Sequence, residues 1–178
     1  MSLLLSAVLV AATLTGCALL QLGRGCEGTD GRVREVAALG ILNSRPDGAT
    51  VARGFEEVDA GCWADSGDVV VYADRTYAFP GTRADVAAHY RTEAVRDGWV
   101  PAPDALPGNL CFTREGMALS VVLLTAERLE EDGHGGRPDL TTGAGYSVGV
   151  DAYVNDAAAA GLTAPVIVRR CQRSGSSR

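Results

Sequence analysis

The sequence contains no lysine, and all 16 of its basic residues are arginines. The absence of lysine excludes Schiff-base chemistry and amine catalysis by that side chain. The net charge is −6, so the chain lacks the basic surplus that phosphate binding needs, and we expect no nucleic-acid partner. No Cys-x-x-Cys spacing occurs, which argues against a zinc ribbon or a thioredoxin-type redox site, and we expect no cofactor.

The N-terminal segment is almost wholly apolar from Leu3 to Leu22 and contains the sequence Leu14-Thr15-Gly16-Cys17. A branched residue, two small residues and a cysteine after an apolar stretch resemble the lipobox of bacterial lipoproteins. This resemblance implies that residues 1–16 are a signal peptide and that the Cys17 thiol carries a diacylglycerol. The chain would then be anchored by lipid to the cell membrane on its extracytoplasmic face.

An alternative for the same segment is an uncleaved inner-membrane anchor, because 20 apolar residues can just span a bilayer. Arg24, Arg32 and Arg34 follow it, and the positive-inside rule would then place the domain in the cytoplasm. The two alternatives differ in the expected state of the cysteines, which would be oxidised outside the cytoplasm and reduced within it.

The chain has five cysteines, so acylation of Cys17 would leave an even number for disulfides. The remaining four cysteines allow three pairings. We favour Cys62–Cys111, which would link two segments that flank the main helix. The second pair would be Cys26–Cys171, which would tie the N-terminal tether to the C-terminal end.

The pattern of apolar residues predicts an α+β domain, in which one main helix packs on an antiparallel sheet of four to five strands with a short N-terminal helix over 32–42. Residues 17–31 are expected to form a tether, 32–172 the single domain and 173–178 a flexible tail. Strands are expected at 69–79, 110–114, 117–125 and 146–154, and weaker strand signals lie at 51–58 and 166–168. A tight hairpin turn is expected at Glu115-Gly116.

The main helix is the best-marked element of the sequence. Thr82 can cap its start, with Asp85 as the capping-box partner three residues on. Gly98 suits the left-handed position that closes a helix, and Trp99 can fold back on the last turn. The sequence therefore predicts a helix from Thr82 to Gly98.

The order of these elements resembles the small uncharacterised lipoproteins of actinobacteria. The matching residues are Cys62 after a turn, the helical segment 85–91, Gly98-Trp99 at the helix end and Cys111-Phe112 on the next strand. The resemblance covers roughly residues 47–154 and supports the Cys62–Cys111 pairing. It implies no catalytic residue.

Two segments carry residues typical of active or metal sites. Gly145-Tyr146-Ser147-Val148-Gly149 matches the G-x-S-x-G string of esterases, but that motif needs a sharp turn into a helix and a later histidine. This segment is predicted to continue as a strand, and no histidine follows His134. The acidic loop around His134 lacks the spacing of a calcium loop, so we expect no metal there. His89, the other histidine, is expected at the surface or flank of the main helix.

We therefore expect a non-catalytic, outward-facing envelope lipoprotein that binds a ligand or a partner. The first alternative is a hydrolase of the envelope that uses Ser147 or the acidic loop 126–144. The second is the inner-membrane protein with an uncleaved N-terminal anchor.

Overall fold

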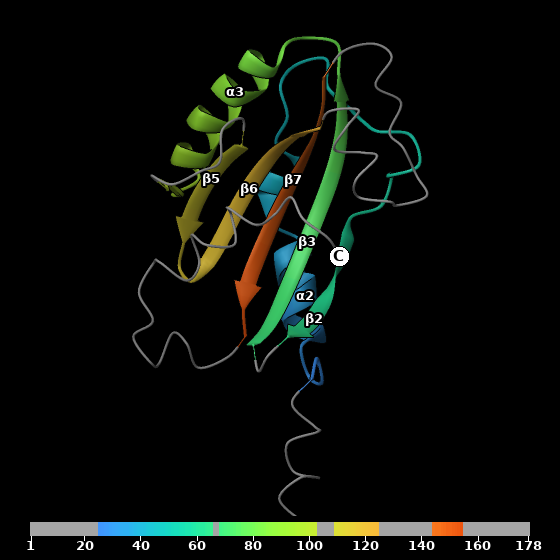
Figure 1. Cartoon of the computed structure of the whole chain (residues 1–178), viewed down its shortest axis with the longest axis vertical. Coiled ribbons are helices and arrows are strands. Elements are labelled where there is room, and N and C mark those ends of the chain that lie inside the picture. The colour runs from blue at the N-terminus through green and yellow to red at the C-terminus, as the bar shows by residue number, and fades with distance from the viewer. Residues whose placement is uncertain (1–24, 66–67, 103–108, 125–143, 155–178) are drawn as a thin grey trace, which may run out of the picture.

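The computed structural model describes residues 25–65, 68–102, 109–124 and 144–154 (Figure 1). These residues form an α+β fold, in which helices pack on an antiparallel sheet. The predicted fold class is confirmed, but the sheet has seven strands and is larger than the four to five that we expected.

The helical elements are α2 (Asp30–Ala37), the 3-10 helix η1 (Gly40–Asn43) and α3 (Arg83–Arg96). The strands are β1 (Thr50–Val51), β2 (Asp59–Asp65), β3 (Asp68–Phe79), β4 (Val100–Pro101), β5 (Asn109–Arg114), β6 (Met117–Leu124) and β7 (Ala144–Tyr153).

The sheet is built around its two longest strands, β3 and β7, which pair over ten residue positions. The strand order is β1-β3-β7-β6-β5-β4, and every pair is antiparallel. The outer edge of β3 is shared, because β2 pairs with its first half and β1 with its end. The chain therefore adds strands at both edges of a central β3–β7–β6 unit.

The sequence did not predict β2 or β4, and it placed a strand at 51–58 where only Thr50–Val51 is paired. β2 contains Ala, Gly and Asp in place of the β-branched residues that favour strands, so it forms because β3 offers a long partner. β4 contains Pro101, which an edge strand tolerates because one side of it needs no partner. The strand expected at 166–168 lies outside the described residues.

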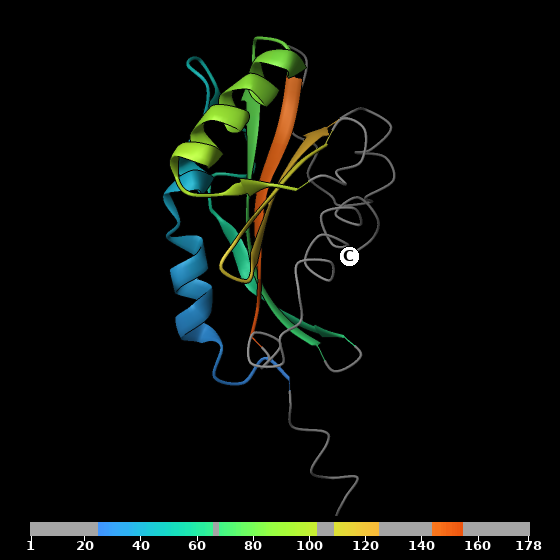
Figure 2. The same ribbon diagram turned by 90° about the vertical axis from the view of Figure 1, so that its left-hand side faces the viewer.

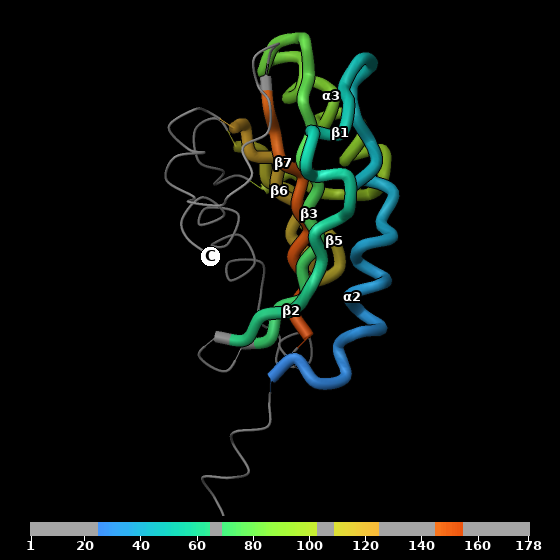
Figure 3. Tube along the Cα trace, turned by 90° about the vertical axis from the view of Figure 1, so that its right-hand side faces the viewer, coloured from blue at the N-terminus to red at the C-terminus, as the bar shows by residue number. Residues whose placement is uncertain are grey.

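Both helices lie on the same face of the sheet (Figures 2 and 3). The strand expected at 146–154 is present as β7, and its residues Tyr146, Val148, Val150 and Ala152 are all buried on this face. The largest fully buried side chains are Trp99, Tyr77, Tyr90, Tyr146, Phe112, Leu42 and Leu119. The core thus lies between this sheet face and the layer formed by α2, η1 and α3.

Helix α3 begins and ends as the sequence predicted. Thr82 and Asp85 form a capping box, in which each side chain accepts a hydrogen bond from the other residue's backbone N–H. Gly98 has φ +82°, and the Trp99 N–H donates back to the carbonyl of Ala94. Trp99 is consequently buried, with only 1% of its surface exposed.

Two further local predictions can be compared with the structure. Glu115 and Gly116 both have positive φ, and they join β5 to β6 in the tight hairpin that we expected. The predicted N-terminal helix is present but divided, because Leu39 is extended and separates α2 from η1. Helix α2 begins at Asp30, inside the segment expected to be tether.

Candidate functional site

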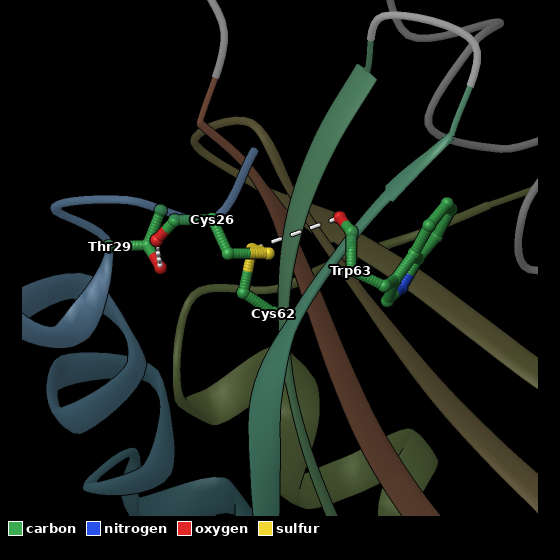
Figure 4. Close-up of a disulfide and its surroundings, with 4 residues drawn as sticks. All are labelled: Cys26, Thr29, Cys62 and Trp63. Carbon is green, nitrogen blue, oxygen red and sulfur yellow. Dashed lines mark hydrogen bonds between the residues drawn. A yellow bond between two sulfur atoms is a disulfide. The ribbon is translucent and has the colours of Figure 1, made fainter. Parts of the chain in front are cut away.

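A disulfide bond joins Cys26, just before α2, to Cys62 on β2 (Figure 4). The two Cα atoms are 5.7 Å apart. Thr29 is buried beside it, and its hydroxyl donates to the carbonyl of Cys26 over 2.7 Å. Trp63 projects from the other side of β2, away from the disulfide. The start of the described chain is thus bonded covalently to the edge of the sheet.

This bond corrects both predicted disulfides, since neither Cys62–Cys111 nor Cys26–Cys171 can form when Cys26 holds Cys62. Strand order explains why. Cys62 is on β2 and Cys111 on β5, and β3, β7 and β6 lie between them. At about 4.8 Å per strand this separation is about 19 Å, far beyond the ~7 Å between Cα atoms that a disulfide allows. Cys111 is itself disulfide-bonded.

Several predicted site residues fall outside the described part of the chain. These are Cys17 with its lipobox, Cys171, His134 and residues 126–143 of the predicted acidic loop 126–144. Among the described residues, no group of three His, Cys, Asp or Glu side chains is placed to hold a metal ion. No helix in the described ranges is long and apolar enough to cross a membrane.

Ser147 lies in the middle of β7, where it pairs with Thr76 of β3 and Val122 of β6. The strand runs on without a break through Tyr153. A nucleophile elbow requires a sharp turn at the serine followed by a helix. The G-x-S-x-G string therefore does not form that motif here.

The histidine of the described chain contacts a different serine, which the sequence analysis missed. His89 Nε2 lies 2.9 Å from the hydroxyl oxygen of Ser44, and both side chains are half-buried. His89 belongs to α3, whereas Ser44 directly follows η1. The two residues are 45 positions apart, so no local spacing could have signalled the contact. His89 is half-buried on the flank of α3, one of the two positions that we expected, but its contact with Ser44 was not predicted.

Burial lowers the pKa of His89 below its ordinary value, although the carboxylates of Glu93 and Asp47 act in the opposite direction. The imidazole is therefore neutral at pH 7, and the direction of its hydrogen bond with Ser44 depends on the tautomer. No hydrogen bond within the described ranges fixes the other ring nitrogen. The pair has the contact of a nucleophile and a base, but no residue of the described chain serves as the orienting group of a triad.

Three tyrosines form the wall behind this pair. The Tyr77 and Tyr146 rings stack with centroids 5.3 Å apart, and Tyr90 meets Tyr146 edge-on at 5.8 Å. Tyr77 donates to the carbonyl of Leu42 over 2.6 Å, and Tyr90 donates to that of Ser44 over 2.5 Å. Two phenol hydroxyls thereby hold η1 and Ser44 against the sheet and α3.

The hydroxyl of Tyr146 is buried and completes no hydrogen bond of normal geometry within the described part of the chain. It lies near the hydroxyl of Tyr90, and this proximity contributes to the pKa shifts of both groups. Burial is the main cause that raises the pKa of Tyr90 and of Tyr146, so both phenols stay protonated at neutral pH. The cluster is therefore an uncharged anchor for Ser44 and His89.

Comparison with protein-family models, with curated proteins and with solved structures gave no match.

Proposed function

We propose that the chain is an envelope lipoprotein, anchored through a lipid on Cys17, whose disulfide-bonded domain faces outward and binds a ligand or partner without catalysing a reaction. The observation that supports this proposal is which cysteines form disulfide bonds. Cys26, Cys62 and Cys111 all belong to disulfides. Cys111 needs a partner, and the sequence offers only Cys17 and Cys171.

One cysteine therefore remains outside the two disulfides, whichever partner Cys111 takes. In the lipoprotein that residue is Cys17, because its thiol is consumed by the lipid. The proposal thus pairs Cys111 with Cys171. An odd cysteine placed at the end of an apolar N-terminal segment is what a lipobox requires.

The disulfides also favour the extracytoplasmic side of the membrane, because cytoplasmic thiols are normally kept reduced. An uncleaved anchor with a cytoplasmic domain would leave Cys26 and Cys62 as thiols, although they are placed for a bond. Only nine peptide steps separate Cys17 from Cys26, which span at most about 30 Å when extended. The anchored domain would therefore stand close to the membrane surface.

A binding role agrees with the position of Ser147, which lies within a continuous strand and has no described histidine beside it. The Ser44–His89 contact is the one observation that favours the second candidate, a serine hydrolase of the envelope. A fluorophosphonate probe tests it directly. Labelling that disappears in Ser44→Ala would favour the hydrolase, whereas an unlabelled protein would leave the binding role.

The proposed anchor is tested by the intact mass of the protein extracted from its own membranes. We expect loss of residues 1–16, gain of a diacylglyceryl group and no alkylation before reduction. After reduction, the cysteines other than Cys17 should all be alkylated. Digestion without reductant should yield one linked pair of peptides with Cys26 and Cys62, and another with Cys111 and Cys171.

Cys17→Ser provides the matched control, because it should keep both linked pairs but lose the lipid and the processing. An unprocessed wild-type chain with freely alkylated thiols would overturn the lipoprotein and support the cytoplasmic alternative. A peptide in which Cys111 is linked to Cys17 would overturn the lipid anchor alone, since that thiol would no longer be available.

A further inference from the structure

The face of the sheet opposite the helices, which we call the far face, carries buried apolar side chains. Side chains alternate between the two faces along a strand, yet six of the eight residues of β6 are buried. Leu119 and Val121 belong to the main core on the helical side. Ala118 and Val122 therefore point to the far face, where they are 3% and 8% exposed. A strand with one solvated face alternates buried and exposed residues, so β6 is covered on both sides.

Neighbouring strands carry buried side chains on the same face. Cys111 on β5 alternates with the core residue Phe112 and is 4% exposed. Val70 on β3 alternates with the core residue Val71 and is completely buried. Both α-helices of the described chain lie on the opposite face (Figures 2 and 3), so another part of the chain or a partner has to cover the far face.

Cys111 indicates which part of the chain covers this face. It is disulfide-bonded, and its partner lies outside the described residues. The proposed function takes Cys171 as that partner, and the chain continues toward Cys171 from the end of β7. The Val154 N–H donates to the carbonyl of Val69, so the chain leaves β7 beside the start of β3.

Cys171 is within reach of Cys111 from this exit point. Cys111 pairs with Ser120 of β6, and Ser120 pairs with Gly149 of β7. Cys111 thus lies two strands across the sheet and about five residues back from Val154, a distance of about 20 Å. The chain from Val154 to Cys171 spans up to about 56 Å when extended. The shortest path between these points crosses the far face, because the Cys111 side chain projects from it.

Two carboxylates lie on the far face. Asp74 is placed there because a Cβ at Gly149 would collide with its carboxylate. Asp151 points the same way, since Val150 and Ala152 on either side of it belong to the main core. The middle of the far face is therefore acidic.

The segment that ends at Cys171 has the complementary composition. Arg169 and Arg170 directly precede the cysteine, and the apolar residues 164–168 precede these arginines. Arginines suit the carboxylates of the far face, and the apolar run suits its buried side chains.

Two other segments suit this face less well. The chain around Cys17 carries no charged residue from Leu3 to Gly23, so it offers nothing to the carboxylates. The loop 126–143 has a surplus of acidic residues, which the same carboxylates would repel. Charge therefore favours the C-terminal segment.

We propose that the far face is the docking surface of the chain's own C-terminal segment, residues 155–171, which the Cys111–Cys171 disulfide anchors. The arginines beside Cys171 pair with the far-face carboxylates, and residues 164–168 cover Ala118 and Val122. The inference rests on the cysteine pairing of the proposed function and does not depend on the lipid anchor. The proposed ligand or partner then binds on another surface of the domain, because this face is occupied.

The test is photo-crosslinking of the full chain in its own membranes. Benzoylphenylalanine replaces Ile167 in one variant and Thr163 in a second, so that a single disruptive replacement does not decide the result. Irradiation should link these positions, within one chain, to far-face residues such as Ser120 or Val122. Val95→benzoylphenylalanine is the matched control, because Val95 is exposed on α3 and should give no such link.

The charge pairing has its own test. In the crosslinking variants, Arg169→Glu/Arg170→Glu should lower the yield about three- to tenfold, because contacts between opposite charges become contacts between like charges. Arg83→Glu/Arg91→Glu makes the same change in net charge at exposed positions of α3 and should leave the yield unchanged. Equal yields from the two double variants would overturn the pairing of these arginines with the far face.

Links that join two chains, or that reach only α2 or α3, would overturn the inference. A lipidated chain that gives no link from either position would overturn it as well and leave the anchor standing. Adding Cys17→Ser should leave the far-face link unchanged, because the docked segment does not need the lipid. An unprocessed wild-type chain that still forms this link would overturn the lipid anchor alone.

Discussion

The Ser44 hydroxyl and His89 Nε2 lie 2.9 Å apart and join the end of η1 to the middle of α3. The neighbouring Tyr90 hydroxyl binds the carbonyl of the same serine. Ser44 is therefore held to α3 through both its side chain and its backbone. This attachment links the two parts of the layer that covers the sheet.

The first prediction concerns pH. The pKa of His89 is lower in the folded chain than its ordinary value, mainly because of burial. At a pH near the ordinary pKa of histidine, the unfolded chain therefore binds more protons at residue 89 than the folded chain does. The free energy of unfolding consequently rises with pH. The contribution of neutral His89 to the free energy of unfolding is complete above the ordinary histidine pKa, near 6.5. It is lost as the pH falls through the pKa of His89 in the folded chain.

Urea unfolding between pH 7 and pH 5 measures this effect. His89→Gln should unfold with a weaker pH dependence in that window. An identical pH dependence in His89→Gln and wild type would show that His89 titrates equally in both states.

The second prediction compares two buried tyrosines that stack on each other. Tyr77→Phe removes the only described donor to the Leu42 carbonyl and should lower the free energy of unfolding by about 1–3 kcal/mol. Tyr146→Phe removes a buried hydroxyl that completes no hydrogen bond of normal geometry with a described residue, so it should not lower the free energy of unfolding. Equilibrium denaturation of both variants measures the difference, and equal costs would contradict the assigned hydrogen bonds.

The third prediction concerns the Cys26–Cys62 disulfide, which closes a loop with a sequence separation of 36. The double variant Cys26→Ser/Cys62→Ser should be less stable by about 4 kcal/mol, because its unfolded chain gains the entropy of the opened loop. Denaturation of the wild type with reductant gives a useful comparison. A double variant as stable as the oxidised wild type would show that this bond does not constrain the unfolded chain.

The fourth prediction uses two glycines in opposite situations. Gly98 closes α3 at φ +82°, so Gly98→Ala should cost about 1 kcal/mol through backbone strain. Gly31 lies within α2 with open space around its Cα, so Gly31→Ala should add about 0.5–1 kcal/mol. Thermal unfolding should move the two melting temperatures in opposite directions. Shifts of the same sign would contradict one of these backbone assignments.

The elements that the sequence predicted correctly are those whose signals are local. Thr82, Asp85 and Gly98 define α3 because capping depends on neighbours a few residues away. The signals for the strand at 146–154 and for the Glu115-Gly116 turn are local in the same sense. Each of these features depends only on residues that are close together in the sequence.

The features that were missed depend on residues far apart in the chain. β2 carries few strand-forming residues and is stabilised by its pairing with β3. The order of strands decides that Cys62 is near Cys26 and far from Cys111, and no spacing of cysteines encodes that order. The Ser44–His89 contact likewise arises only when η1 has docked against α3.

The Cys26–Cys62 bond also determines how the chain responds to tension. A force applied to the chain ahead of Cys26 crosses the sulfur atoms directly to β2 and reaches β3 through their paired backbones. Residues 27–61, with α2 and η1 among them, are bypassed by the covalent link and carry no load. The force therefore cannot unfold α2 from its N-terminal end. The backbone pairing of β2 with β3 bears the force instead.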